Sequence, residues 1–220
     1  MTSHKPLLSQ TKLERLECLA FENCLRLHKD SILLYRNRCF PSAFFLSVLA
    51  LEEYGKVLWI DECIFHTRLR EMDRESQELW LNATLSHSYK QGIFARMVGN
   101  RLPKNIERLV ATKQIEVEKQ NAAYVGLPKH KKSIIWEGRI INPARISKTK
   151  VYRQITALND ILLETVLGNI KETFNFDAES MEVMLDRKMY SKLLANMKPA
   201  SKKTKRLLNL IEQSYRDFED

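Results

Sequence analysis

Residues 41–60 read PSAFFLSVLALEEYGKVLWI, and this stretch decides how the rest of the chain folds. It is apolar except for the charged pentad EEYGK at residues 52–56. A helix that is apolar nearly all round is usually central in a bundle rather than on its surface. We therefore predict a central helix that begins near Pro41, since proline suits a first helical turn, and runs to about Arg70.

The pentad places two carboxylates and one ammonium in a segment that otherwise favours burial. Burying charge is unfavourable unless the groups pair, form hydrogen bonds or neutralise. Glu52 and Glu53 precede Lys56 by four and three residues, so on a helix each shares a face with Lys56 and can pair with it. Two interpretations are open: an internal ion pair that fixes helix register, or a functional pocket, because perturbed ionisable groups cluster at sites.

The rest of the chain has mainly helical periodicity. Asn23 is a polar residue within the apolar stripe of the first helix, so we expect it to face the bundle interior. Asp73 and Ser147 suit N-caps. The expected helices beside the central one span residues 11–38, 74–100, 104–122, 148–174, 177–197 and 201–217. Residues 124–146 are expected to form loops and short extended pieces that can pair as a hairpin.

This pattern predicts an all-α protein with an up-and-down helical bundle. We divide the chain into a helical core at 1–122, a basic loop or hairpin with a helix completing the bundle at 123–175, and a C-terminal helical appendage at 176–220. The start of the sequence lacks a secretory pattern, and no apolar run has the ~20 residues of a membrane span. The four cysteines lack zinc-ligand spacing. We expect a soluble cytoplasmic protein without a metal, a cofactor or a membrane partner.

The formal charge of +9 is concentrated in one section. Residues 129–153 hold eight Lys or Arg against the single acid Glu137, which is +7 in one segment of 25 residues. Aromatic rings for base stacking lie among the phosphate-binding charges, as in nucleic-acid interfaces. The candidate RNA-binding residues are Lys129, Lys131, Lys132, Trp136, Arg139, Arg145, Lys148 and Lys150.

His87 is the histidine placed best for chemistry, within the sequence SHSYK at residues 86–90. On a helix His87 and Lys90 can point into one cleft, where an imidazole moves a proton and an ammonium stabilises charge on phosphorus. That pairing suits metal-free RNA cleavage through the 2′-hydroxyl. The alternative is a structural histidine hydrogen-bonded to a neighbour. Walker loops, GxGxxG, nucleophile elbows and HExxH are absent from the sequence.

Four segments in order resemble the AbiV family of abortive-infection proteins, which belongs with the HEPN-like helical domains of prokaryotic defence. They are FENCLRL at 21–27, ALEEYGK at 50–56, SHSYK at 86–90, and a layout of Ala123, Tyr124, Trp136, Pro143 and Ile146. The resemblance covers residues 13–146 and implies a HEPN-like bundle. It also implies phage defence, in which an infected cell arrests translation after sensing a phage-encoded protein.

HEPN-like relatives are frequently metal-independent ribonucleases that act as homodimers with an Arg-x4–6-His motif. In this chain no arginine lies five to seven residues before any histidine, and Asn82 stands five before His87. Two functions stay open: a ribonuclease, or a non-catalytic effector that binds RNA, the ribosome or a phage protein and blocks translation by occupancy. For the ribonuclease, the resemblance and the spacing together suggest that His87 transfers protons and that Lys90 and Lys56 stabilise phosphate. Glu53 would hold Lys56, and Asn23 would contribute a hydrogen bond.

Overall fold

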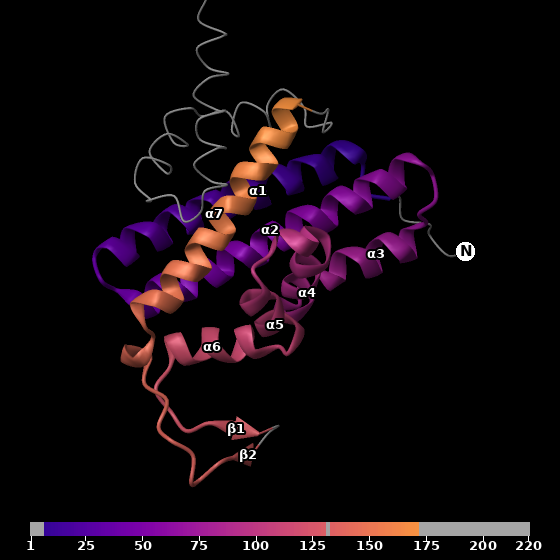
Figure 1. Cartoon of the computed structure of the whole chain (residues 1–220). Coiled ribbons are helices and arrows are strands. Elements are labelled where there is room, and N and C mark those ends of the chain that lie inside the picture. The colour runs from indigo at the N-terminus through magenta and orange to yellow at the C-terminus, as the bar shows by residue number, and fades with distance from the viewer. Residues whose placement is uncertain (1–6, 131–132, 172–220) are drawn as a thin grey trace, which may run out of the picture. The chain divides into compact units, whose positions relative to one another are not determined.

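A computed structural model describes residues 7–130 and 133–171 of the chain (Figure 1). The described part of the protein is all-α apart from one short hairpin, as predicted. The helices are α1 (Gln10–Arg36), α2 (Phe40–Arg68), α3 (Arg74–Ala83), α4 (His87–Val98), α5 (Lys104–Ala111), α6 (Gln114–Ala123) and α7 (Lys148–Lys171). Single 3-10 turns lie at Gly99–Arg101 and Pro143–Arg145, and the strands β1 (Lys129–His130) and β2 (Ser133–Ile134) form a short antiparallel pair.

The chain divides into two compact units, residues 1–154 and 155–220. The first holds α1 to α6, the hairpin and the first turns of α7, and every site discussed below lies within it. In the second, the structure describes residues 155–171 as the continuation of α7. The predicted divisions at 122/123 and 175/176 stay predictions, and the helices expected at 177–197 and 201–217 lie outside the described residues.

Helix α2 is the centre of the first unit, as the apolar stretch predicts. Helices α1 and α2 lie antiparallel along each other after a tight turn in which Arg38 has a φ of 60° (Figure 1). Helices α3, α4 and α6 contact the remaining sides of α2. At one end, Leu13 of α1 packs with Ile60, Cys63 and Ile64 of α2. Because α2 is enclosed by these helices, its charged residues must find partners on its neighbours.

The helix starts predicted from capping residues are confirmed. Pro41 lies in the first turn of α2, and the Asp73 side chain accepts a hydrogen bond from the Ser76 amide at 2.8 Å. Ser147 precedes α7, and its Oγ accepts from the Lys150 amide at 3.3 Å. These caps satisfy amides that have no partner within their own helix.

Two predicted helices are each broken in two. The helix expected at 74–100 is interrupted at residues 84–86, so His87 is the first residue of α4 and the expectation that it lies mid-helix was wrong. The helix expected at 104–122 is interrupted at Lys113, which adopts a left-handed φ of 56°. After these breaks, α4 and α6 pack against α2.

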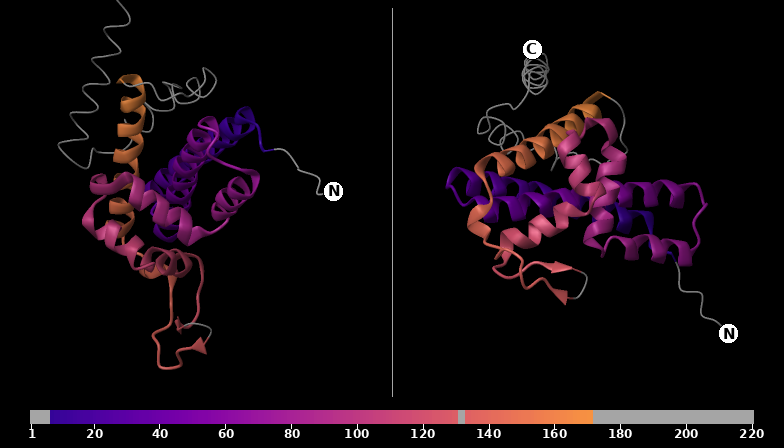
Figure 2. Two further views of the ribbon diagram at one scale, coloured as in Figure 1. Left: turned by 90° about the vertical axis from the view of Figure 1, so that its right-hand side faces the viewer. Right: turned by 60° about the horizontal axis from the view of Figure 1, so that its bottom comes forward.

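The hairpin predicted near 124–146 is present. Lys129 pairs with Ile134 and His130 with Ser133, and Gly126 bridges to Ile141 nearer the bundle. We call residues 124–142 the arm. It extends away from helices α1 to α6 in the views of Figures 1 and 2. In the described part of the chain, no helix combines the length and the hydropathy needed to cross a membrane.

Candidate functional site

Glu52 of α2 is the centre of a polar network. Its side chain is 1% exposed, and each carboxylate oxygen is bound. Oε1 accepts hydrogen bonds from Gln91 Nε2 at 2.7 Å and from Lys119 Nζ at 2.8 Å, while Oε2 lies 2.6 Å from His87 Nδ1. A carboxylate with this little solvent is stable in the fold only because these groups replace water.

A second carboxylate shares the same partners. Lys119 of α6 is 2% exposed and also binds Glu116 Oε2 at 2.7 Å, to which Gln91 donates a further bond at 2.8 Å. Burial raises the pKa of Glu116, but hydrogen bonds from Lys119, Gln120 and Gln91 outweigh it and the net pKa is lowered. We call Glu52, His87, Gln91, Glu116 and Lys119 the Glu52 network. It joins α2, α4 and α6.

The imidazole of His87 is fixed on one edge and open on the other. Ser86 caps α4 by accepting from the Tyr89 amide at 3.3 Å, which sets His87 as the first helical residue. The side chain is 55% exposed although Nδ1 contacts a buried carboxylate. A carboxylate on Nδ1 orients the ring and favours the tautomer in which Nε2 is the basic nitrogen. The arrangement therefore presents Nε2 as a proton acceptor or donor.

The other predicted charged residues form a looser group beside this network. Glu53 lies 3.8 Å from Lys56 Nζ and 3.9 Å from Lys90 Nζ, and all three side chains are mostly buried. Glu53 also acts on α1, where burial first, and then the charge of Glu53, raises the pKa of the Cys24 thiol. The structure thus brings Glu53, Lys56 and Lys90 together.

Asn23 is hydrogen-bonded within its own helix rather than to the groups it was expected to join. It is half-buried on α1, and its Oδ1 accepts a hydrogen bond at 2.8 Å from Arg26 on the same helix. Its neighbour Cys24 is the residue whose side chain is fully buried against α2. The inward face of α1 is thus set by Cys24, and in the described structure Asn23 has no bond to His87, Glu53 or Lys90.

Gly55 explains how α4 comes close enough for these contacts. A Cβ built on Gly55 would lie within 3.0 Å of the Lys90 carbonyl oxygen and 3.3 Å from Phe94 Cβ. Only glycine therefore allows the α4 backbone to lie against α2 at this point. The next residue back, Tyr54, packs its ring between Phe21 and Phe94, with centroids at 6.3 and 6.0 Å.

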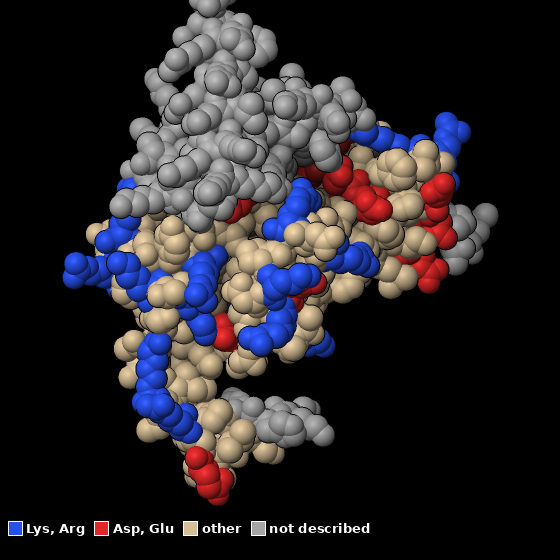
Figure 3. All heavy atoms as spheres, in the orientation of Figure 1, with Lys and Arg blue, Asp and Glu red and all other residues tan. Residues whose placement is uncertain are grey.

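The basic residues lie mostly on and beside the arm. Trp136 is 78% exposed, and Arg139, Arg145 and Lys148 are exposed as well. On the face that Figure 3 shows, Lys and Arg follow the stem of the arm and the nearby ends of α6 and α7, while acidic side chains gather beside α3. Lys150 differs because its Nζ binds Glu118 at 2.7 Å. Lys129 lies in β1, and Lys131 and Lys132 lie outside the described residues.

Sequence reasoning missed three members of the Glu52 network and the role of Glu52 itself. Glu52 was expected to pair with Lys56, but its bonded partners come from α4 and α6. A signal for Lys119 was present, because it shares a helical face with the buried Ile115 and Ala122. A lysine at an apolar position of a short helix indicates a buried ion pair, and the mixed charge of this segment concealed it.

Comparison with known proteins identifies the family. The family model of HEPN-type AbiV proteins, described as AbiV, matches residues 12–164. The match includes α1 from residue 12, helices α2 to α6, the arm, and α7 as far as residue 164. Comparison with the curated proteins gives no match, and comparison with the solved structures gives none either. The match spans more than half of the chain, and together with the all-α bundle it shows that the chain belongs to the AbiV family of HEPN-like proteins.

Proposed function

We propose that this protein is an abortive-infection effector that cleaves RNA without a metal and thereby arrests translation in the infected cell. Membership of the AbiV family suggests abortive-infection defence. The observation that carries the catalytic proposal is the 2.6 Å contact between buried Glu52 and half-exposed His87. We further propose that it acts in the cytoplasm as a homodimer and responds to a phage-encoded protein.

The proposed reaction is transfer of the phosphoryl group from the 5′-oxygen to the 2′-oxygen. His87 Nε2 accepts the 2′-hydroxyl proton, the 2′-oxygen attacks phosphorus, and the bond to the 5′-oxygen breaks. The products are a 2′,3′-cyclic phosphate and a 5′-hydroxyl, which takes up one proton. Glu52 stabilises the imidazolium that forms, as a buried carboxylate does for a catalytic histidine. Since each chain offers one such histidine, a homodimer supplies a second as the acid.

Lys56 and Lys90 are proposed to stabilise charge on the phosphate. Glu53 lies at 3.8 and 3.9 Å from their ammonium groups, distances too long for hydrogen bonds, so neither lysine is tightly held by it. Lys56 is the more exposed of the two, with a side chain 24% exposed. It is therefore the better candidate of the two to reach a phosphate, and Lys90 adds a second positive charge beside it.

Replacing His87 with alanine tests the catalytic proposal. We expect cleavage of cellular RNA by the pure protein to fall by about 10²–10⁴-fold, the contribution typical of general acid–base catalysis. Protection in a phage-plating assay is expected to be lost at normal protein levels. RNA ends mapped after incubation in a chelator should carry cyclic phosphates with wild-type protein.

His66→Ala is the matched control. His66 also contacts a carboxylate, Glu71 Oε2 at 2.9 Å, but that partner is exposed and lies beyond the C-terminal end of α2. We expect His66→Ala to retain cleavage and protection. Equal activity of His87→Ala and wild type would refute the catalytic role, and equal loss in both histidine variants would assign the effect to folding.

A second function, translation block by occupancy, is favoured by the arm. Its exposed Trp136 lies within the section of charge +7, and stacking beside basic side chains suits single-stranded RNA. Under this alternative the joint replacement Trp136→Ala and Arg139→Glu removes RNA binding and protection, while His87→Ala retains both. Filter binding at several salt concentrations measures the affinity for RNA. The affinity of the double variant should depend less steeply on salt than that of wild type.

A further inference from the structure

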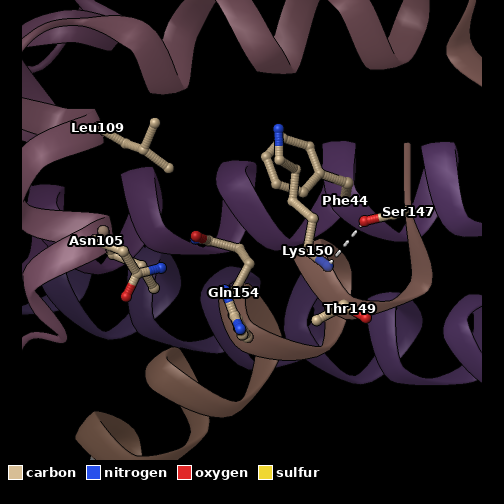
Figure 4. Close-up of a pocket in the computed structure, with 9 residues that line it drawn as sticks. Phe44, Asn105, Leu109, Ser147, Thr149, Lys150 and Gln154 are labelled. Carbon is tan, nitrogen blue, oxygen red and sulfur yellow. Dashed lines mark hydrogen bonds between the residues drawn. The ribbon is translucent and has the colours of Figure 1, made fainter. Parts of the chain in front are cut away.

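A cavity of about 220 Å³ opens between the start of α2, α5 and the first turns of α7 (Figure 4). Its inner wall is apolar and consists of Phe44, Ile106 and Leu109, of which the first two are fully buried. A largely apolar cavity with a few polar groups directed into it is the usual form of a small-molecule site. It lies apart from the Glu52 network, with which it shares no residue.

Gln154 supplies the strongest polar feature of this cavity. Gln154 is only 3% exposed, yet its side-chain Nε2 has no hydrogen-bond partner in the described part of the chain. Its amide end lies in the space between Leu109 and Lys150 (Figure 4). A buried donor left unpaired is unfavourable and rare. The free donor therefore indicates that a ligand with an acceptor atom completes this site.

The charges of the cavity favour a neutral group inside and an anion at its mouth. Lys150 Nζ is bound to Glu118 Oε1 at 2.7 Å, so its charge is offset within the protein. Asn105 adds a second, exposed amide from α5. The mouth is formed by the first turn of α7 with Ser147 and Arg153, and the first turn of a helix attracts anions.

We propose that this cavity binds one nucleobase of a nucleotide, with the nucleotide's phosphate at the first turn of α7. The size fits a base rather than a larger ligand, because sites for drug-sized molecules begin at about 300 Å³. An amide side chain offers a donor and an acceptor to one edge of a base, as Gln does for adenine. The proposal rests on the proposed function only in naming RNA as one source of the nucleotide, and a free nucleotide has the same chemistry.

Calorimetric titration of the full chain tests the proposal. The probes are the four nucleoside 5′-monophosphates, inorganic phosphate, and single-stranded hexanucleotides of each base. We expect at least one base, free or in a hexamer, to bind at one site per chain, at least about tenfold more tightly than inorganic phosphate. Gln154→Leu should weaken that binding by about tenfold, the effect of one good hydrogen-bonding pair.

Gln154→Leu should fold, because it replaces an unpaired buried donor with an apolar group of similar size. Asn105→Ala alters an exposed residue and gives a second variant, expected to weaken binding less. Binding of hexamers alone identifies RNA as the source of the bound base. Binding of monophosphates identifies free nucleotides as the source. Either result supports the site. The proposal is overturned if no probe binds, if phosphate binds as tightly as the nucleotides, or if both variants bind like wild type.

The catalytic proposal and the cavity proposal can be refuted independently of each other. His87→Ala should bind the base with wild-type affinity, because His87 is not among the residues that line the cavity. Loss of cleavage in His87→Ala, with wild-type base binding in both Gln154→Leu and Asn105→Ala, would reject only the cavity proposal. Base binding lost in Gln154→Leu, together with full activity of His87→Ala, would reject only the catalytic function.

Discussion

Replacing Lys119 with methionine is expected to lower the free energy of unfolding by about 3–5 kcal/mol, the loss typical when one partner of a buried ion pair is removed. Methionine keeps most of the side-chain volume, so the change is chiefly the loss of the ammonium. Lys119 Nζ is within 2.8 Å of Glu52 Oε1 and 2.7 Å of Glu116 Oε2. Without it the two carboxylates are left with His87, Gln91 and Gln120, of which the two glutamines are neutral. Urea unfolding at pH 7 measures the difference.

Lys56→Met is the matched control, because it makes the same chemical change at a half-buried lysine whose carboxylate partner is 3.8 Å away. Because the two groups are beyond hydrogen-bond distance and both keep some contact with solvent, we expect a contribution near that of exposed pairs, about 0–1 kcal/mol. We expect the free energy of unfolding of Lys56→Met to lie within that range of the wild-type value. If both variants lost the same stability, the Glu52 network would have no special energetic role.

The pH dependence of the Lys119→Met effect provides a second check. A carboxyl whose folded pKa lies below the unfolded value of about 4.3 stabilises the fold above that pH, and this contribution is lost as pH falls through the folded pKa. The pKa of Glu116 is lowered by hydrogen bonds that include the one from Lys119. The stability gap between wild type and Lys119→Met should therefore narrow as the pH falls below that unfolded value.

Local signals in the sequence located most of the fold. Pro41, Asp73 and Ser147 marked helix starts correctly, because capping depends on residues within one turn. The break before α4 was missed although Ser86 is a capping residue, since the apolar residues on both sides continued a helical period. The break at Lys113 was missed because the sequence gives no signal that this lysine adopts a left-handed backbone conformation. Such breaks are decided by packing against α2.

The residues of the charged pentad at 52–56 differ in their structural roles. Glu52 binds His87, Gln91 and Lys119 on other helices, so the ion pair with Lys56 that the register-fixing interpretation assumed is made by Glu53 and not by Glu52. His87 was identified from its own segment. Its partner was not, because the two residues are 35 apart and Lys119 is 67 from Glu52. Periodicity reports which face of a helix is buried, and only the tertiary structure reports what that face meets.

Gly55→Ala is expected to destabilise the protein by about 1–3 kcal/mol or more, the range for overpacking a close contact. Elsewhere in a helix the same change is favourable by up to about 1 kcal/mol, because alanine has the higher helix propensity. Here the new methyl would meet the Lys90 carbonyl, a backbone atom that cannot rotate away. Relief requires α4 to move off α2. Thermal and urea unfolding measure the loss.

Gly92→Ala is the internal control, since Gly92 lies on the same α4 and a Cβ there meets nothing within 4 Å. It should leave stability equal or raise it by up to about 1 kcal/mol. The two substitutions therefore differ in sign although their chemistry is identical. Movement of α4 would also lengthen the 2.6 Å contact between His87 and Glu52, so Gly55→Ala should lose the proposed RNA cleavage even at temperatures where it stays folded. A stable Gly55→Ala with full activity would show that the close approach of α2 and α4 does not position His87.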